Sequence, residues 1–365
     1  MKNYSEFMEY IKENVTDYLP ERFEEAEISI QQVVKNNDVV LDGLSIRNPD
    51  SNISPNIYLN PLYEQYQKGR NLDELVSGIA DTYIENMEPI ENRTFQVQIE
   101  DIKNYEVVKG EIFPRLVNLE KNTTRLQNVP YMQREDLAIT YHVKVSGNRD
   151  SIGSLMITNE LMEVYGVTKE KLHTQAMENM ERLSSPVFLP LGEMIVDVMT
   201  EDFGRNEGVS QEEAKEYVKD MIPTGGPNVY CLTNQYKMNG AVGIMSESIQ
   251  QMVADRVGGD YYVLPSSVHE VLIVPQSAGM DPEELTDMVN TVNEGCVMQD
   301  EILSDHVYQY DAKEHKLSLC APAKEMKQEQ TMEQNRQSAF EEKSIDATKQ
   351  PEQSHEPIKH SGRSH

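Results

Sequence analysis

The chain has 365 residues, of which 62 are acidic and 33 basic, so its formal net charge at pH 7 is −29. Such an acidic surface repels phosphate backbones and anionic lipids, which argues against direct binding of nucleic acid or of a membrane. The N-terminus lacks the apolar core of a signal peptide, no apolar run approaches the ~18 residues of a membrane span, and the three cysteines are widely spaced with no CxxC motif. We therefore expect a cytoplasmic protein without disulfides.

The first 92 residues predict a helix, a hairpin and two further helices. Apolar side chains recur at helical spacing from Ser5, the expected N-cap, to Tyr18. Two strand-like runs follow, joined by Asn36-Asn37-Asp38, a tight-turn signal. Residues 56–69 predict a short strand that runs into a helix, and Asn71 is expected to cap the next helix.

The central part predicts further strands and helices. Residues 94–128 have a mixed pattern and are interpreted as a connecting segment. Residues 137–145 alternate, so His142 should lie on the polar face, opposite the face formed by Leu137, Ile139, Tyr141, Val143 and Val145. A strand turning into a helix is expected at 151–166, followed by a helix capped by Thr168 and an acidic helix capped by Ser210.

The last third predicts a further sheet. Strands are expected at 229–234, 240–245, 260–266, 270–276, 306–312 and 315–320, with helices at 246–259 and 281–296. From Lys324 onward aliphatic residues are scarce, so the chain cannot bury enough surface to offset its conformational entropy, and we expect disorder.

Two segments resemble each other, 57–87 and 155–180. Each has a strand, an Asn, an amphipathic turn with Tyr, a Gly and a second helix that ends in Glu-Asn-Met. The sequence thus predicts an α+β protein with mixed or antiparallel sheets, packed helices and two related helix–sheet units. The expected divisions are an N-terminal unit, a central unit, a C-terminal unit and a disordered tail, at 1–92, 93–222, 223–323 and 324–365.

The run 261–275 places Ser266, Ser267, His269 and Glu270 between two apolar stretches. A catalytic triad needs the base to approach the nucleophile with a third group behind the imidazole, and neighbours on one strand rarely reach that geometry. Neither serine lies in a Gly-x-Ser-x-Gly elbow. We therefore interpret the segment as a hairpin whose turn side chains are exposed, and keep these four residues as candidates for a binding surface.

Other chemical motifs are absent from the sequence. The eight histidines form no HxH or HExxH pattern, no GxGxxG occurs, and Pro223-Thr224-Gly225-Gly226 lacks the Lys-Ser/Thr of a phosphate loop. The sequence therefore assigns no catalytic residue, no metal ligand and no cofactor.

Four stretches, "IFPRLVNLEKN", "LQNVPYMQREDLAITYHV", "ITNELMEVYGVTKEKLHTQAMEN" and "YYVLPSSVHEVLIVP", carry a family resemblance. Over most of residues 1–320 the chain resembles DUF5688, a family of uncharacterised proteins of gut Gram-positive bacteria. Its middle and C-terminal parts are more distantly similar to the YtpQ-like uncharacterised family. Neither resemblance implies an activity or a catalytic residue.

Three hypotheses for function follow. The first is a non-enzymatic protein-binding module with an unidentified protein partner, because acidic helices are many and catalytic motifs are absent. The second is an enzyme whose site is assembled from distant residues such as His142, His173 or His269. The third is an acidic mimic or regulator of a basic partner, encoded by a mobile element.

Overall fold

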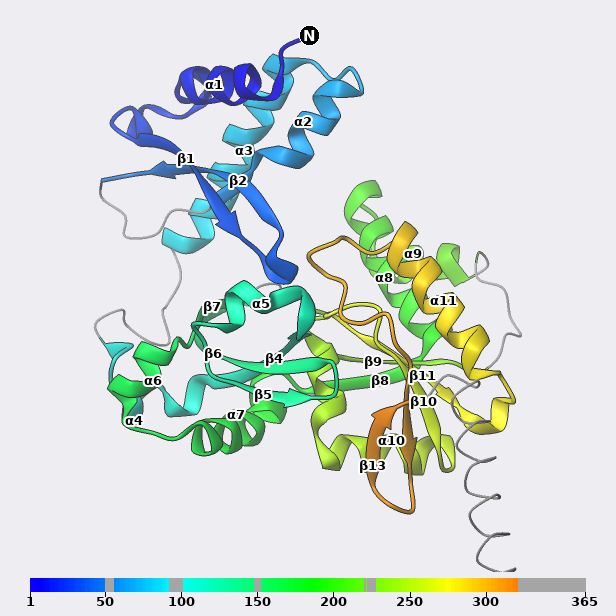
Figure 1. The fold of residues 1–365 in the computed structure, drawn as a ribbon. Helices are drawn as coiled ribbons and strands as arrows, with labels where there is room; N and C mark the ends of the chain where they lie inside the picture. The colour runs from blue at the N-terminus through cyan, green and yellow to red at the C-terminus, as the bar shows by residue number, and fades with distance from the viewer. Residues whose placement is uncertain (50–55, 92–100, 148–151, 220, 222–227, 321–365) are drawn as a thin grey trace, which may run out of the picture. The chain divides into compact units, whose positions relative to one another are not determined.

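A computed structural model describes residues 1–49, 56–91, 101–147, 152–219, 221 and 228–320. Within these ranges the chain forms three antiparallel sheets with packed helices, which confirms the α+β class (Figure 1). Residues Met1–Leu319 form one compact unit. No helix in the described ranges is both long enough and apolar enough to cross a membrane. The tail predicted to be disordered lies outside the described residues, and the division of 1–323 into three units stays a prediction.

The N-terminal residues build a three-stranded sheet with its own core. The strands β1 (Glu27–Val34), β2 (Val40–Arg47) and β3 (Asn56–Tyr58) pair in that order. Apolar side chains of α1 (Tyr4–Asn14), α2 (Leu59–Gln67) and α3 (Leu72–Glu91) pack with residues of β2 in this core. Asn71 caps α3 as predicted, its side chain accepting from the Asp73 amide. The N-cap of α1 is Asn3 and not Ser5, because Asn3 and Glu6 form a reciprocal capping box.

The β1–β2 hairpin is confirmed, with Val34 opposite Val40. Its tip is the single turn η3 (Asn36–Asp38), where Asn37 has φ 59° and Asp38 has φ 51°. Asn and Asp tolerate this left-handed backbone better than other side chains, which explains why these residues form the turn.

The central sheet is organised around β6 (Leu137–Gly147), which pairs with β4 (Ile112–Asn118), β5 (Tyr131–Arg134) and β7 (Ile152–Met156). Alternate side chains of β6 from Leu137 to Val143 enter a core that α4 (Tyr105–Val108) and α7 (Lys169–Leu183) also line. The predicted alternation is thus correct. The interpretation of 94–128 as a connecting segment is wrong for β4, whose buried backbone pairs along most of its length with β6.

The two similar segments have the same order of elements. β3, α2 and α3 follow one another in the first, and β7, α6 (Asn159–Tyr165) and α7 in the second. Thr168 caps α7 as predicted, its hydroxyl accepting from the Lys171 amide. That the two helix–sheet units are related stays a prediction.

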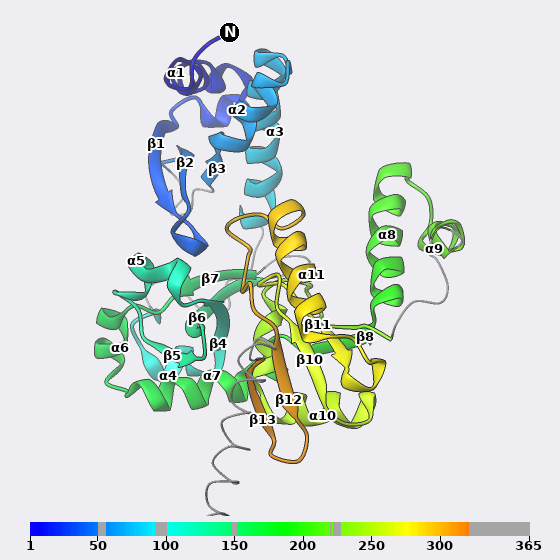
Figure 2. The same ribbon diagram turned by 45° about the vertical axis from the view of Figure 1, so that its right-hand side comes forward.

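The third sheet has six strands in the order β13-β12-β10-β11-β9-β8. Their bounds are β8 (Pro186–Pro190), β9 (Tyr230–Asn234), β10 (Tyr261–Leu264), β11 (Val271–Pro275), β12 (Tyr308–Asp311) and β13 (Lys316–Leu319). The chain also forms α10 (Glu247–Val257) and α11 (Pro282–Gly295). The helices α8 (Leu191–Glu207) and α9 (Gln211–Lys219), which follow β8 and precede β9 in the sequence, lie side by side (Figure 2). One apolar core contains residues of both this sheet and the central sheet.

One predicted strand, 240–245, is instead the buried 3₁₀ turn η7 (Gly240–Met245). The Gly240 amide donates to the His269 carbonyl at 2.9 Å, and a Cβ at position 240 would lie 2.5 Å from Thr233 Oγ1. Glycine therefore lets this turn press against β9 and the segment after β10, which a regular strand could not do.

Candidate functional site

The segment 261–275 is a hairpin, as predicted, with Tyr261 opposite Pro275 and Leu264 opposite Leu272. Its connection is not exposed, however, because residues 301–304 cover it. Ser267 forms a bridge with Ile302, and the Val268 amide donates to the Glu301 carbonyl at 2.9 Å. Only 6% of the surface of Ser267 is exposed to solvent, so the expectation of exposed turn side chains is wrong for this serine.

Ser267 and His269 do not form a nucleophile–base pair. The Ser267 hydroxyl accepts a hydrogen bond from the backbone amide of His269 at 3.0 Å. The His269 ring points elsewhere: Nδ1 accepts from the Asn239 amide at 3.2 Å, and Nε2 lies 3.2 Å from a Glu301 carboxyl oxygen. Both ring nitrogens are therefore engaged, with the proton on Nε2, and His269 fixes loops and does not act as a base.

The other two candidates, Ser266 and Glu270, differ in how they are held. Ser266 contributes its carbonyl, which accepts from the Leu303 amide at 3.1 Å. Glu270 is partly buried, and burial raises the pKa of its carboxyl, with Glu301 adding to the rise and His269 and Ser267 opposing it. Neither arrangement assigns chemistry to these two residues.

His269 and Glu301 lie at one side of a cavity of about 410 Å³, within the usual size range of small-molecule sites. We name it the Arg115 pocket. Its other walls are Arg115 of β4, Thr140 and His142 of β6 and Arg125 of α5 (Thr123–Leu126), with further lining from residues 33–36, 116–117, 239, 268 and 300.

The register of the central sheet brings the polar side chains together. Arg115 is opposite Thr140, and Phe113 is opposite His142. Residues at alternate positions of paired strands share a face, so the guanidinium, the hydroxyl and the imidazole lie on the face opposite the apolar core. His142 is thus on the face opposite Tyr141, as expected, but this face is not a solvated polar one, because His142 is only 3% exposed and Val117 and Ala138 beside it are buried in an apolar cluster.

Arg115 is incompletely paired. Its Nη2 donates to Ser154 Oγ at 2.8 Å and its guanidinium lies over the Phe113 ring, 5.5 Å from the centroid. Its Nε is buried and has no hydrogen-bond partner. No carboxylate of the described residues forms an ion pair with Arg115. Burial, and then the charge of Arg125, lower the pKa of Arg115 to about 10.

Arg125 adds a second guanidinium. Burial also lowers its pKa, and Asp38 partly opposes that shift. The Asp38 carboxylate accepts from the backbone amides of Thr124 and Arg125, at 2.8 and 3.3 Å, so it also holds the start of α5. The pocket therefore has a cationic wall inside a strongly acidic protein.

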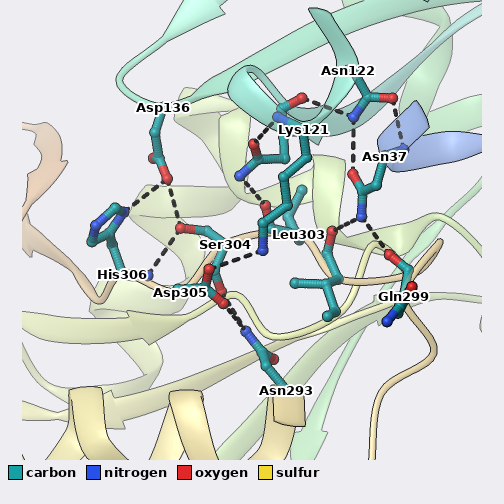
Figure 3. A network of polar contacts seen from close by, with 12 residues as sticks. Asn37, Lys121, Asn122, Asp136, Asn293, Gln299, Leu303, Ser304, Asp305 and His306 are labelled. Carbon is teal, nitrogen blue, oxygen red and sulfur yellow. Dashed lines mark hydrogen bonds and ion pairs between the residues drawn. The ribbon is translucent and has the colours of Figure 1, made fainter. Parts of the chain in front are cut away.

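A second polar cluster joins Asp136, Ser304 and His306 (Figure 3). The Ser304 hydroxyl and His306 Nδ1 both contact the same oxygen of Asp136, at 2.7 and 3.0 Å, and Tyr308 donates to the other oxygen. Burial alone would raise the pKa of Asp136, but these hydrogen bonds outweigh it and lower the pKa. Because Ser304 is fully buried and bonded to the acid, the cluster is a structural junction and not a catalytic triad.

Residues 33–36, next to the tip of the β1–β2 hairpin, line the Arg115 pocket. The tip itself forms a third set of polar contacts, with Asn122 and with the 299–302 loop, also drawn in Figure 3. The Asn37 amide group donates to the carbonyls of Gln299 and Ile302 at 2.8 and 2.7 Å. Asn37 and Asn122 also exchange two hydrogen bonds of 2.9 Å. The hairpin, α5 and the 299–302 loop are therefore tied together at the rim of the pocket.

Fold and site together describe an α+β protein with a cationic pocket on the face of its central sheet that lies opposite the main apolar core. The chain belongs to DUF5688, a family of unknown function, whose model matches residues 4–312. The comparisons with curated proteins and with solved structures returned no match.

Sequence reasoning missed both arginines of the pocket. The available signal was Arg115 itself, a charged residue within the otherwise apolar run 112–117. A charge in a buried strand requires a partner or a function.

Proposed function

We propose that this protein binds a small molecule through an anionic group held by Arg115 and Arg125. The observation that carries the proposal is that Arg115, a buried cation without a carboxylate partner among the described residues, lines the pocket together with the second guanidinium of Arg125. A buried cation without a counter-ion is destabilising by several kcal/mol unless something compensates it. A carboxylate or phosphate in the pocket would supply the missing counter-charge to the two guanidinium groups.

The rest of the molecule makes this arrangement unusual. With a net charge of −29, the surface as a whole repels anions, so two inward-facing arginines are a local exception. The recognition is therefore expected to depend on contact inside the pocket and not on long-range attraction.

Isothermal titration with inorganic phosphate and with glycerate tests the proposal. Arg115→Gln and Arg125→Gln should each weaken binding about ten- to one-hundred-fold, the usual loss for one charge-assisted hydrogen bond. Arg134→Gln is the matched control, because Arg134 is exposed, does not line the pocket and donates a hydrogen bond to the neighbouring Gln133 carbonyl. Loss of binding in the control as well, or no binding of either anion by the wild type, would contradict the proposal.

A second measurement needs no ligand. If Arg115 is kept for binding, Arg115→Met should leave the free energy of unfolding of the ligand-free protein unchanged or raise it, because a poorly paired buried charge is removed. A loss of more than about 2 kcal/mol would instead assign Arg115 a structural role.

The protein-binding role expected from the sequence is the second candidate. It is supported by α8, where Ile195, Val198 and Met199 share one face and are 39%, 39% and 37% exposed. A protein that co-purifies with the wild type from the native host should be lost with Val198→Glu combined with Met199→Glu. It should be kept with Asp202→Asn on the same helix, and an unchanged set of partners in the double variant would refute this role.

We further propose that the protein is bacterial and cytoplasmic. The family resemblance supports the first point, and the free thiols of Cys231 and Cys296 support the second. The enzyme hypothesis now depends on His142 or His173, because both ring nitrogens of His269 are engaged. The acidic-mimic hypothesis rests on the net charge alone.

A further inference from the structure

The imidazole of His142 is held by a short chain of hydrogen bonds. The Thr140 hydroxyl donates to the carbonyl of Arg115 at 3.4 Å across the β4–β6 pair. The same oxygen lies 3.3 Å from Nε2 of His142. Since the single hydroxyl proton is used by the carbonyl, the oxygen must accept from the ring, which places the imidazole proton on Nε2.

The other ring nitrogen, Nδ1, is then left with a lone pair. It has no hydrogen-bond partner among the described residues, and His142 lines the Arg115 pocket beside both guanidiniums. Burial, followed by the charges of Arg115 and Arg125, holds the pKa of His142 well below its ordinary value. The ring is consequently neutral at pH 7, and Nδ1 is an acceptor in a wall that otherwise offers cationic donors.

We infer that the ligand of the Arg115 pocket is a hydroxylated oxyanion, in which a hydroxyl group near the anionic group donates a hydrogen bond to His142 Nδ1. The inference rests on the proposed anion binding and deepens it. A simple oxyanion satisfies Arg115 and Arg125 but leaves Nδ1 without a donor. A hydroxylated phosphate and a hydroxy acid share the required chemistry, since each carries acceptors for the guanidiniums and a donor for the imidazole.

Two matched pairs of probes separate these sources. Glycerol 3-phosphate and n-propyl phosphate have the same anionic group and chain length but differ in hydroxyl groups, as do glycerate and propionate. With the full-length wild type, the hydroxylated member of at least one pair should bind about five-fold more tightly, the contribution of one neutral hydrogen bond. The pair that shows this preference identifies the phosphate or the carboxylate source.

Two variants at position 142 assign the preference to the imidazole. His142→Leu removes the acceptor and should abolish the preference while the non-hydroxylated probe still binds. His142→Asn offers an amide oxygen close to the position of Nδ1 and should retain part of the preference. Circular dichroism and the melting temperature of each variant establish that it is folded before its affinities are compared.

The outcomes distinguish the inference from the proposed function. If both members of each pair bind equally well, or if His142→Leu keeps the preference, the hydroxyl inference is overturned while anion binding stands. If none of the four probes binds the wild type, anion binding is overturned and the inference falls with it.

Discussion

Nε2 of His142 lies 3.3 Å from the hydroxyl oxygen of Thr140, two residues earlier on the same face of β6. Burial removes His142 from water, and the neighbouring Arg115 and Arg125 oppose a further positive charge. The result is an imidazole that stays neutral in the folded protein, and this has a consequence for stability.

The pKa of His142 predicts how stability changes with pH. Its folded-state pKa is well below the ordinary value of 6.5, so the unfolded chain binds the proton more readily. The stabilisation is fully present above about pH 6.5 and is lost as the pH falls below it, with a slope of at most about 1.4 kcal/mol per pH unit. Urea unfolding at several pH values should show this slope, and His142→Asn should remove the part that His142 contributes.

His173 is a second contributor to the slope, because burial also lowers its pKa, and Tyr141 bonds to its ring. His173→Asn should therefore remove a separate part of the slope. The lowered pKa values of Asp136 and Asp305 act only below their ordinary value of 3.8, outside this window. A wild-type slope that persists unchanged in His142→Asn would contradict the assignment.

The close approach of Gly240 to its neighbours predicts a severe effect of Gly240→Ala. The added Cβ would lie 2.6 Å from the Asn234 amide nitrogen and 2.8 Å from the His269 carbonyl oxygen, both backbone atoms that cannot move alone. We expect a loss of about 3 kcal/mol in the free energy of unfolding, at the upper end for overpacking. Gly78→Ala in α3 is the matched control, since its Cβ meets no atom within 4 Å and should stabilise the helix by up to about 1 kcal/mol. Equal effects of the two substitutions would refute the argument.

Three alanine substitutions in the hairpin 261–275 should lower the free energy of unfolding by different amounts. Ile273 is fully buried, so Ile273→Ala should reduce the free energy of unfolding by about 2–5 kcal/mol, and Leu272→Ala, at a half-buried position, should cost less. Ser267→Ala removes the acceptor of the His269 amide and should cost about 1–3 kcal/mol, more than an exposed turn residue would. Denaturant titration measures all three, and a Ser267→Ala protein as stable as the wild type would show that the buried contact contributes little.

Asn37 combines a left-handed backbone with side-chain hydrogen bonds, and substitutions can separate these two contributions to stability. Asn37→Gly keeps the left-handed backbone and the bond from its amide to Asn122, but loses the side-chain contacts with Gln299, Ile302 and Asn122. Asn37→Ala loses both, and should be less stable than Asn37→Gly by about 1 kcal/mol. The two unfolding free energies, compared with the wild type, give the separate contributions of conformation and contacts. If alanine equals glycine, the turn conformation is not what selects asparagine here.

Local patterns determined a large part of the fold. The alternation in 137–145 fixed which side chains of β6 share a face, because strand periodicity is a property of the backbone. The tight turn at Asn36–Asp38 and the caps Asn71 and Thr168 were also predictable, since each depends on hydrogen bonds within a few residues. The error at Ser5 was local too, since Asn3 offered an equally good cap with Glu6 three residues on.

Only the tertiary structure decided where the site lies. The sequence placed His142 on a polar face, yet its burial beside Arg115 depends on the β4–β6 register, and Arg125 arrives from a different element. Likewise, Ser267 is buried because residues 301–304, more than thirty positions away, cover the connection. Such contacts depend on which distant segments pack together, and that is set by the burial of the shared core and not by any local pattern.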